Sequence, residues 1–306
     1  MRLKTVGILF ISLFFAGTIL SCEVIEGFVQ AAGAAGMDKK TVDSSIKAIK
    51  ASSRSIDTAL EDITPEQEYY IGRAIAANIL AKYKLYTKNP TLTRYLNNIC
   101  AAIAINSALP YSHGAFKGYH VAMLDSREIN AFATSGGHIF ITRGLVSIAK
   151  SEDALAGVIA HEVAHIQLQH SIKSIKNSRF AQAVSVTGKS TVDVATGLTG
   201  VDITALMDES VGDIVQTLFD NGYSQAQELD ADNTAMRLLA WAGYNPSGLI
   251  DMLKALNAAQ KPGEGFGKTH PHPSTRISNA EITILLYGGV KDTSEKRKAR
   301  FASAIK

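Results

Sequence analysis

The sequence predicts an α+β protein that is mainly α-helical, with a small β-sheet beside one long helix. Apolar residues recur at helical spacing over most of the chain, which indicates helices packed on a common core. Three short runs in the middle of the chain, residues 119–124, 129–133 and 138–142, have the alternating or apolar pattern of strands. Hydrophobic residues make up 46% and charged residues 19% of the sequence, a composition typical of a globular protein.

Helices are expected on the N-terminal side of the predicted strands. Apolar residues recur at three- and four-residue intervals over residues 41–61, from Pro65 to Tyr83, and again after Pro90. Proline suits the first position of a helix, because the amide hydrogen that it lacks would have no partner inside the helix. These three segments are therefore predicted to be helices.

The longest helix is expected directly after the strands. Ser151 suits its N-cap, and Glu152 and Asp153 place negative charge in its first turn, where the helix dipole favours it. This helix is predicted to run from Ala154 to about Ile175. Further helices are expected from about Ser224 to Ala242, from Asn245-Pro246 to Ala259 and after Pro273, whereas residues 181–222 are weakly periodic and are expected to form short helices or a cover over the site.

The N-terminus has the layout of an export signal. Arg2 and Lys4 precede an uncharged apolar run, which is too short to span a membrane comfortably and ends at Ser21-Cys22. The ending resembles a bacterial lipobox, in which the cysteine is lipidated; a conventional signal peptide is the alternative. The predicted organisation is a lipoprotein signal peptide over residues 1–21, a lipid anchor at Cys22, a tether over residues 22–40 and a single domain over residues 41–306.

Charge and cysteine content limit the possible partners. The net charge is +3, from 31 basic and 28 acidic residues, and the sequence has no basic block that would bind nucleic acid. Basic residues cluster only from Lys291 to Arg300, where a solvated helix end is expected. If Cys22 is lipidated, Cys100 remains as a single thiol in an apolar segment, expected to be buried and inert. No later uncharged run approaches 18 residues, so an anchored rather than a spanning protein is expected.

The sequence His161-Glu162-Val163-Ala164-His165 predicts a metal centre on the long helix. Residues four apart lie on one face of a helix, so both histidines can offer a ring nitrogen to one metal ion. Glu162 is rotated by about 100° from His161, which places its carboxylate beside the metal, where it can act as a general base. Two imidazoles favour Zn²⁺, and one zinc ion per chain is expected.

Glu228 is the best candidate for a third ligand. Glu228 and Asp232 are four residues apart, so one helix face presents both carboxylates, whereas Asp230 points elsewhere. Glu228 can bind the metal while Asp232 accepts the outer N–H of a ligand histidine, which fixes the tautomer of that ring. Ordinary solvated charges are the alternative interpretation for both.

His170 is a weaker candidate for the third ligand. The extended metzincin pattern places its third histidine six residues after the second, with a glycine between them. Here Ser171 stands at that ligand position and Leu168 at the glycine position, so His170 is expected to be a helix-end residue.

HExxH followed by ExxAD resembles the zinc peptidase family of the CAAX prenyl proteases and the bacterial heat-shock membrane protease. The resemblance covers roughly residues 65–285. The leader resembles that of an exported lipoprotein branch, the peptidases that act in outer-membrane protein quality control. The matching segments are Asn130–Ala133, Gly136-Gly137, Ile141–Leu145, Tyr223-Ser224 and Thr269–Pro273 with Arg276-Ile277.

This resemblance implies a gluzincin-like endopeptidase that cleaves unfolded or misassembled envelope proteins on the periplasmic face of the outer membrane. His270 is then expected near the zinc, as a transition-state stabiliser or as a reversible fourth ligand that keeps the enzyme latent; a plain loop histidine is the alternative. Arg276 is expected either to pair with a carboxylate near the site or to anchor the last helix.

Polypeptides are the expected partners, together with the membrane through Cys22. The segment containing Ala133, Gly136 and Gly137 is predicted to bind the substrate backbone as an added strand, although an ordinary hairpin turn explains the glycines equally well. Two other functions fit the same residues: a non-catalytic chaperone or assembly factor that uses the cleft to hold client proteins, and a zinc hydrolase of a non-peptide bond. Pure binding would not require Glu162. No sequence feature specifies the oligomeric state.

Overall fold

The computed structural model describes most of the chain between residues 63 and 305. Among the described residues, no helix is both long and apolar enough to cross a membrane. The elements below belong to one compact unit, which comprises residues 62–177 and 207–306. The described residues are Lys40, Asp43, 63–109, 117–177, 222–259, 265–266, 270, 273–287 and 294–305.

Several predicted features lie outside the described residues. For these features the sequence-based expectations stay predictions. They are the signal peptide over residues 1–21, Cys22, the tether and the helix over residues 41–61 (except for Lys40 and Asp43), and residues 181–221.

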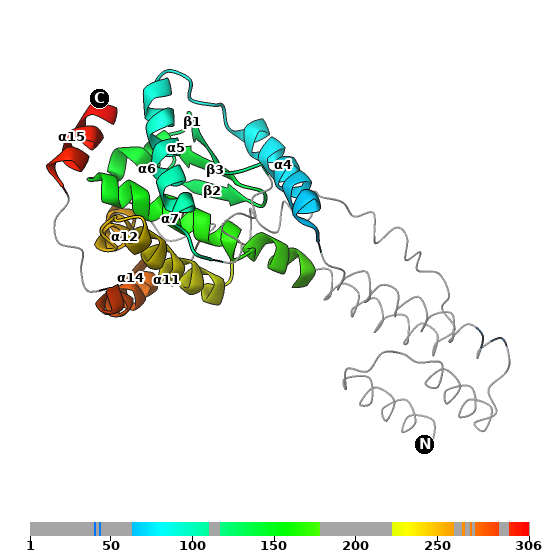
Figure 1. Cartoon of the computed structure of the whole chain (residues 1–306). Coiled ribbons are helices and arrows are strands. Elements are labelled where there is room, and N and C mark those ends of the chain that lie inside the picture. Colours follow the sequence, from blue (N-terminus) through cyan, green and yellow to red (C-terminus); the bar gives the residue numbers. More distant parts are fainter. Residues whose placement is uncertain are drawn as a thin grey trace. The chain divides into compact units, whose positions relative to one another are not determined.

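The described elements confirm a mainly helical α+β architecture with one three-stranded sheet (Figure 1). The helices and strands largely follow the segments predicted from the sequence. In chain order they are α4 (Pro65–Lys82), α5 (Pro90–Ile105), β1 (His120–Leu124), β2 (Ala131–Thr134), β3 (His138–Thr142), α6 (Arg143–Ile148), α7 (Glu152–Gln167), α11 (Gln225–Trp241), α12 (Ser247–Ala259), α14 (Pro273–Thr283), the 3-10 helix η2 (Ile284–Tyr287) and α15 (Glu295–Ala304).

Side-chain caps fix where the helices begin. The Thr64 hydroxyl accepts from the Gln67 amide at 3.2 Å, and Gln67 Oε1 accepts in return from the Thr64 amide at 2.8 Å. The same reciprocal box joins Ser224 and Gln227 at the start of α11. Ser151 caps α7 as predicted, its hydroxyl accepting from the Ala154 amide at 3.1 Å. These bonds satisfy amide groups that have no partner within the first turn.

The sheet has the strand order β1-β3-β2, with β1 parallel and β2 antiparallel to β3. β2 and β3 form a hairpin whose turn contains Gly136 and Gly137 at φ values of 80° and 100°. This left-handed region favours glycine because a side chain would collide with the backbone. Gly136 and Gly137 thus form a hairpin turn, which was one of the two interpretations of these glycines. Strand β2 lies at one edge of the described sheet.

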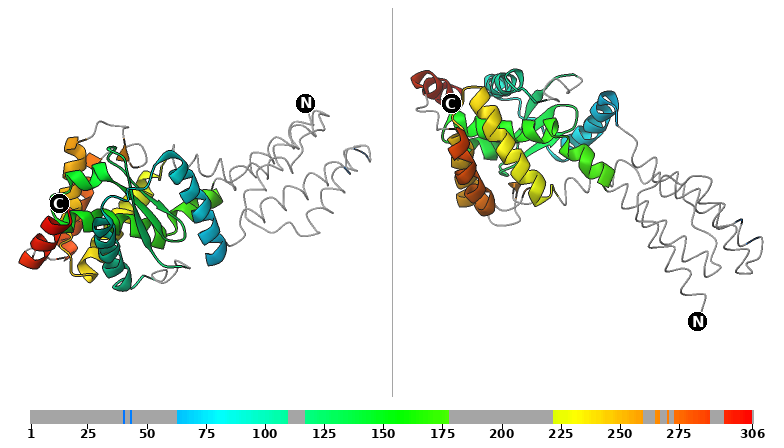
Figure 2. Two further views of the ribbon diagram at one scale, coloured as in Figure 1. Left: turned by 90° about the horizontal axis from the view of Figure 1, so that it is seen from above. Right: turned by 60° about the horizontal axis from the view of Figure 1, so that its bottom comes forward.

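Alternation along the strands divides the sheet into two apolar faces. Figure 2 shows the strands and the helices around them in two further views. Phe132 and Phe140 on one face pack with Ile75 and Ile79 of α4. The opposite face joins the main core with α5 and α7 and includes Val121, Met123, Ala131, Ile139 and Ile141. Successive strand residues point to opposite faces, so three short strands can hold helices on both sides.

Helix α7 lies at the centre of the described core, and all of its residues are buried. It packs against α5, α11, α12 and β2. Gly157 allows the closest approach to α12: a Cβ atom there would lie 2.8 Å from the Leu249 backbone nitrogen. Because α7 is buried on all sides, its polar side chains have to find partners inside the protein.

The prediction that the long helix continues unbroken to about Ile175 is wrong. Leu168 caps α7 with its amide bonded to the Ala164 carbonyl at 2.8 Å, and Gln169 adopts a left-handed φ of 54°. Helical structure resumes over residues 170–177, beginning with the Lys173 amide bonded to the Gln169 carbonyl at 2.9 Å. The chain therefore bends one turn after the second histidine of the motif.

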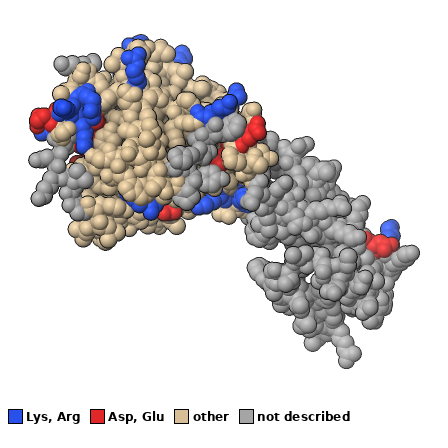
Figure 3. Space-filling view, in the orientation of Figure 1, with Lys and Arg blue, Asp and Glu red and all other residues tan. Residues whose placement is uncertain are grey.

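The expectation of a merely solvated basic helix end is also wrong for two residues of α15. Arg297 Nη1 lies 2.6 Å from Asp153 Oδ1, and Arg300 forms an ion pair with Glu152. Both carboxylates are buried in the first turn of α7 and need a cation nearby. Figure 3, drawn in the orientation of Figure 1, shows acidic and basic side chains gathered at α15.

The thiol of Cys100 is buried as expected, with 1% exposure. Burial raises its pKa to about 12, so the reactive thiolate is scarce at neutral pH.

Replacing Gly157 by Ala should lower the free energy of unfolding by about 1–3 kcal/mol, because the methyl group would force α7 and α12 apart. In an open helix the same change stabilises by about 1 kcal/mol. Urea denaturation measures the difference, with Ala77→Gly at an exposed position of α4 as the control for helix propensity alone. A more stable Gly157→Ala variant would contradict the close packing.

Candidate metal centre

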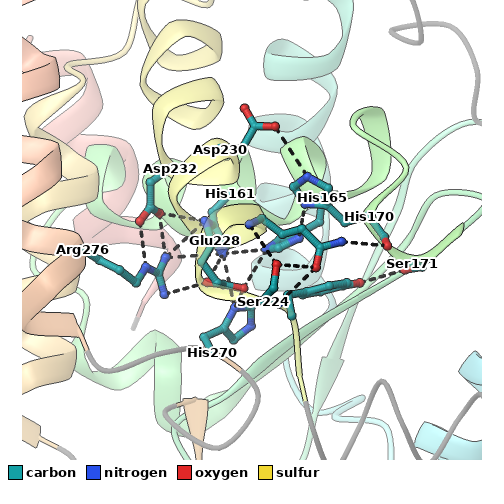
Figure 4. A network of polar contacts seen from close by, with 12 residues as sticks. His161, His165, His170, Ser171, Ser224, Glu228, Asp230, Asp232, His270 and Arg276 are labelled. Carbon is teal, nitrogen blue, oxygen red and sulfur yellow. Dashed lines mark hydrogen bonds and ion pairs between the residues drawn. The ribbon is translucent and has the colours of Figure 1, made fainter. Parts of the chain in front are cut away.

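Three parts of the chain bring four ligand-type side chains together: His161 and His165 from α7, Glu228 from α11, and His270 before α14. One ligand atom from each residue lies within 4.8 Å of all the others, and the four side chains are buried. Figure 4 shows them converging between the two helices. The fold therefore unites residues that are more than 100 positions apart in the sequence.

The spacing of these atoms fits a tetrahedral zinc site. His161 Nε2 lies 3.0 Å from His165 Nε2 and 3.5 Å from Glu228 Oε2, and His165 Nε2 lies 3.3 Å from Glu228 Oε1. Ligands at the usual zinc distances are about 3.3–3.5 Å apart in a tetrahedron. Glu228 Oε2 makes no hydrogen bond with the described residues and lies 3.3 Å from Arg276 Nη1, so this buried oxygen keeps a position at which a metal ion could bind.

His270 lies within this cluster, not in a remote loop. Its Nδ1 is 2.7 Å from Glu228 Oε1 and 3.4 Å from His161 Nε2. Its ring stacks on Phe266, with the centroids 4.0 Å apart and the planes 11° from parallel. The ring nitrogen therefore lies among the other three ligand-type side chains, where it could serve as a further ligand of a metal ion.

Asp232 and Arg276 support His161 from its outer side. His161 Nδ1 is 2.9 Å from Asp232 Oδ1, which fixes the tautomer that leaves Nε2 for the cluster. Arg276 binds Asp232 in a bidentate manner, with Nε–Oδ2 and Nη2–Oδ1 distances of 2.7 Å each. Its Nη1 is 3.3 Å from Glu228 Oε2. Arg276 was expected either to pair with a carboxylate near the site or to anchor the last helix. It does both, because it pairs with Glu228 and Asp232 and thereby joins α14 to α11.

Charge compensation sets the protonation of these groups. Burial alone would raise the pKa of Asp232, but Arg276 and His161 lower it to about 2. Burial likewise opposes ionisation of Glu228, yet His270 and Arg276 hold the pKa of Glu228 well below its usual range. Burial and Arg276 lower the pKa of His161, but Asp232 and Glu228 outweigh them and raise it to about 9. Without a metal ion the carboxylates are therefore ionised and His161 is protonated at neutral pH. Metal binding requires the ionised carboxylates and would release the proton from His161 Nε2.

His165 has different outer contacts, which the sequence analysis missed. His170 Nδ1 lies 2.9 Å from His165 Nδ1, and the Tyr223 ring stacks on the His165 ring with centroids 4.1 Å apart. The Tyr223 hydroxyl is 2.8 Å from Ser171 Oγ. Burial lowers the pKa of His170 to about 4, so its ring is neutral at pH 7. The sequence signal was His170 itself, five residues after His165, but the sequence analysis considered it only as a third metal ligand and otherwise as a helix-end residue.

Glu162 is fully buried, and neither of its carboxylate oxygens has a hydrogen-bond partner among the described residues. Burial raises its pKa, while the neighbouring His270 and His161 act in the opposite direction. A carboxylate with free oxygens and a raised pKa is suited to accept a proton.

The remaining predicted residues are divided between the sheet and the surface. Ala133 lies in β2 and packs against the main core, the one that contains α7. Gly136 and Gly137 lie in the turn that follows. Asp230 is 57% exposed and its Oδ2 is 3.8 Å from His170 Nε2, too far for a hydrogen bond.

Comparison with known proteins bears directly on this centre. The model of peptidase family M48 matches residues 90–284, which hold the four converging side chains and most of the described elements. The chain belongs to peptidase family M48. The predicted family is thereby confirmed at this level, and the mainly helical fold with a buried His/Glu cluster agrees with an M48 metallopeptidase.

M48 relatives of the chain include proteases from bacteria and yeast. The beta-barrel assembly-enhancing protease of Yersinia pestis is 26% identical over 199 residues, which cover 63% of this chain and 39% of that protein. Metalloprotease LoiP of Escherichia coli is 27% identical over 195 residues, 64% of this chain and 71% of LoiP. The mitochondrial metalloendopeptidase OMA1 of Schizosaccharomyces pombe is 27% identical over 159 residues, covering 50% of this chain and 42% of OMA1. The chain thus spans about two fifths of the first of these relatives.

Replacing Arg276 by Met should make the metal-free protein less stable at neutral pH, so that it unfolds at a higher pH when acid is added. Because the pKa of Asp232 is lowered to about 2, its ion pair stabilises the fold at neutral pH, and this contribution is lost as the pH falls from about 4 towards 2. Without the guanidinium, a buried carboxylate stays uncompensated, at a cost of roughly 3–5 kcal/mol. The acid-unfolding midpoint followed by circular dichroism should therefore rise.

The control is Arg143→Met, which removes a half-exposed partner of Asp125. An exposed pair of this kind contributes about 0–1 kcal/mol. Equal acid-unfolding midpoints for Arg276→Met and Arg143→Met would show that the buried pair does not stabilise the fold.

Proposed function

We propose that the chain is a zinc-dependent endopeptidase that hydrolyses peptide bonds in unfolded or misassembled proteins of the cell envelope. The observation that carries this proposal is the convergence of His161, His165 and Glu228 beside Glu162, whose buried carboxylate has no partner in the described residues. A binding protein would gain nothing from an unpaired buried carboxylate, which is costly to the fold. Membership of family M48 supports the same reaction class.

Each residue of the site has a role in this reaction. His161, His165 and Glu228 would hold one zinc ion, which when bound supplies a Lewis acid that polarises the scissile carbonyl. Glu162 takes a proton from the attacking water through one of its free oxygens and then delivers it to the leaving amine. Asp232 keeps His161 in the required tautomer, and Arg276 keeps Asp232 ionised.

His270 is proposed as a reversible fourth ligand that keeps the enzyme latent. The 2.7 Å distance from its Nδ1 to Glu228 Oε1 places the ring against a ligand, where it excludes a substrate oxygen from the same corner. The alternative role is to stabilise the transition state of peptide hydrolysis, and for this role the ring would first have to move away from Glu228. The two roles predict opposite effects of removing the ring.

Strand β2 is proposed to receive the substrate backbone. It lies at one edge of the described sheet and is followed by the turn at Gly136 and Gly137. A peptide paired with such an edge is bound through main-chain hydrogen bonds, which accept many sequences. This mode of binding suits a protease for unfolded segments.

The envelope assignment rests on the leader and on the relatives. LoiP and the beta-barrel assembly-enhancing protease are bacterial proteins of the same family. The lipobox-like ending at Cys22 would anchor the chain in a membrane, which we propose is the outer membrane, with the chain on its periplasmic face. Labelling with a radioactive fatty acid, compared between wild type and Cys22→Ala, tests the anchor.

Replacing Glu162 by Gln should abolish cleavage of an unfolded protein such as casein while leaving bound zinc unchanged. Loss of a general base costs about 10²–10⁴-fold in rate, and the amide keeps the shape of the side chain. Metal analysis and gel-based degradation of both proteins make the measurement. If both proteins bind stoichiometric zinc and cleave casein at equal rates, Glu162 is not the general base. If wild type and all variants, including His270→Ala, bind zinc but none cleaves casein, the client-binding function is favoured.

Replacing His270 by Ala should increase the rate of casein cleavage, because the fourth corner then becomes available to substrate. Zinc content should remain stoichiometric, since His161, His165 and Glu228 still provide three ligands. A matched control is His120→Ala, at an exposed histidine whose Nε2 lies 3.0 Å from the Lys117 carbonyl oxygen. A fall in cleavage rate with unchanged zinc content would instead assign His270 to transition-state stabilisation.

A further inference from the structure

We propose that His170 is a positioning residue for His165: it accepts a hydrogen bond from Nδ1–H of that ring and thereby holds Nε2 toward the metal. The inference rests on the proposed metal centre. It concerns a residue outside the ligand set, because the group of converging ligand atoms contains His161, His165, Glu228 and His270 but not His170.

The contact that carries the inference joins the outer nitrogens of the two rings. His165 Nδ1 and His170 Nδ1 are 2.9 Å apart, and both side chains are 1% exposed. His165 Nε2 is turned toward Glu228 Oε1 at 3.3 Å. A neutral imidazole that offers Nε2 to a metal carries its proton on Nδ1, so a buried acceptor is needed there.

Among the described residues, no carboxylate accepts a hydrogen bond from His165 Nδ1. Asp232 serves His161, with Oδ1 2.9 Å from His161 Nδ1, while Asp230 is mostly exposed and lies nearer to His170, 3.8 Å from its Nε2. The two ligand histidines thus have unlike partners, one anionic and one neutral. Outer-sphere acceptors of this kind orient the ring and tune its basicity.

The bend at Gln169 is what brings His170 back to His165. In a continuous helix, residues five apart are offset by about 140° around the axis and do not meet. Gln169 has a left-handed φ of 54°, which costs a non-glycine residue on the order of 1 kcal/mol or more. Its side chain compensates, because Nε2 donates to the buried Glu68 carboxylate of α4 at 3.1 Å.

The segment after the bend is also held by α11. Gln227 Nε2 donates to the His170 carbonyl and to Ser174 Oγ, each at 3.2 Å. Ser171 Oγ contacts the Tyr223 hydroxyl, whose ring stacks on His165. His170 is therefore fixed on two sides, by α4 through Gln169 and by α11 through Gln227, as a positioning role requires.

The test compares two polar replacements and one apolar replacement in the full protein. Asn can place an amide oxygen near the position of His170 Nδ1, whereas the oxygen of Gln lies one bond farther out, and Leu has no acceptor. Zinc affinity is measured by competition with a chromogenic chelator, and the absorption spectrum of the cobalt-substituted protein reports the geometry of the centre. Thermal unfolding of each metal-free protein shows whether the fold itself has changed. The exposed His120→Asn change is the control for loss of a histidine.

His170→Leu and His170→Gln are expected to weaken zinc binding by about 10–100-fold and to alter the cobalt spectrum. His170→Asn is expected to retain most of the affinity and the wild-type spectrum, although it also removes the imidazole. If His170→Leu does not fold, the comparison of Asn with Gln still decides the question.

Wild-type affinity in His170→Leu or His170→Gln would overturn the inference. The inference would also be overturned if the Asn and Gln variants lost zinc affinity equally and in proportion to the stability that each loses without metal. That result would mean that His170 stabilises the fold and does not position His165. Failure of the wild type to bind zinc would overturn the metal centre itself and this inference with it, a result distinct from zinc binding that is insensitive to His170.

Discussion

The buried pair of Arg276 and Asp232 is the interaction on which the rest of the site depends. Helix α11 presents Glu228 and Asp232 on one face, and both are completely buried. Two carboxylates cannot be removed from water together unless a cation is supplied nearby. Arg276 supplies it from α14, at 2.7 Å from Asp232 and 3.3 Å from Glu228. The place of α14, and of His270 just before it, therefore follows from the charge on α11.

A second constraint is the burial of α7 on every side. Because each residue of the helix is packed, the two histidines cannot turn away from α11, and the general orientation of the centre is set by packing before any metal binds. The tautomers are set by groups outside α7, namely Asp232 for His161 and His170 for His165. Packing thus determines where the rings lie, and hydrogen bonding determines which nitrogen they offer.

The features predicted correctly from the sequence depend on neighbours close in the chain. The four-residue spacing of His161 with His165, the cap at Ser151, the helix that begins near Ser224 and the turn at Gly136-Gly137 all follow from local geometry. The end of α7 was missed because the left-handed Gln169 is stabilised by Glu68, 101 positions away. The partners of α15 were missed for the same reason, since Arg297 and Asp153 are 144 positions apart. The hydrophobic periodicity of the sequence carries no information on contacts between residues so far apart in the chain.

The neutral partner of His165 is consistent with the charge of the whole centre. Glu162, Glu228 and Asp232 are three carboxylates, and the Arg276 guanidinium lies against two of them, Glu228 and Asp232. In the metal-bound state the ligand histidines are neutral, so that Arg276 is the cation among these four side chains. When all are ionised, two negative charges remain, which a single divalent cation balances. A carboxylate at position 170 would leave a third negative charge in a buried region, at a cost of several kcal/mol. An imidazole fulfils the need for a hydrogen-bond acceptor beside His165 without adding charge, and for that reason the two ligand histidines have unlike partners.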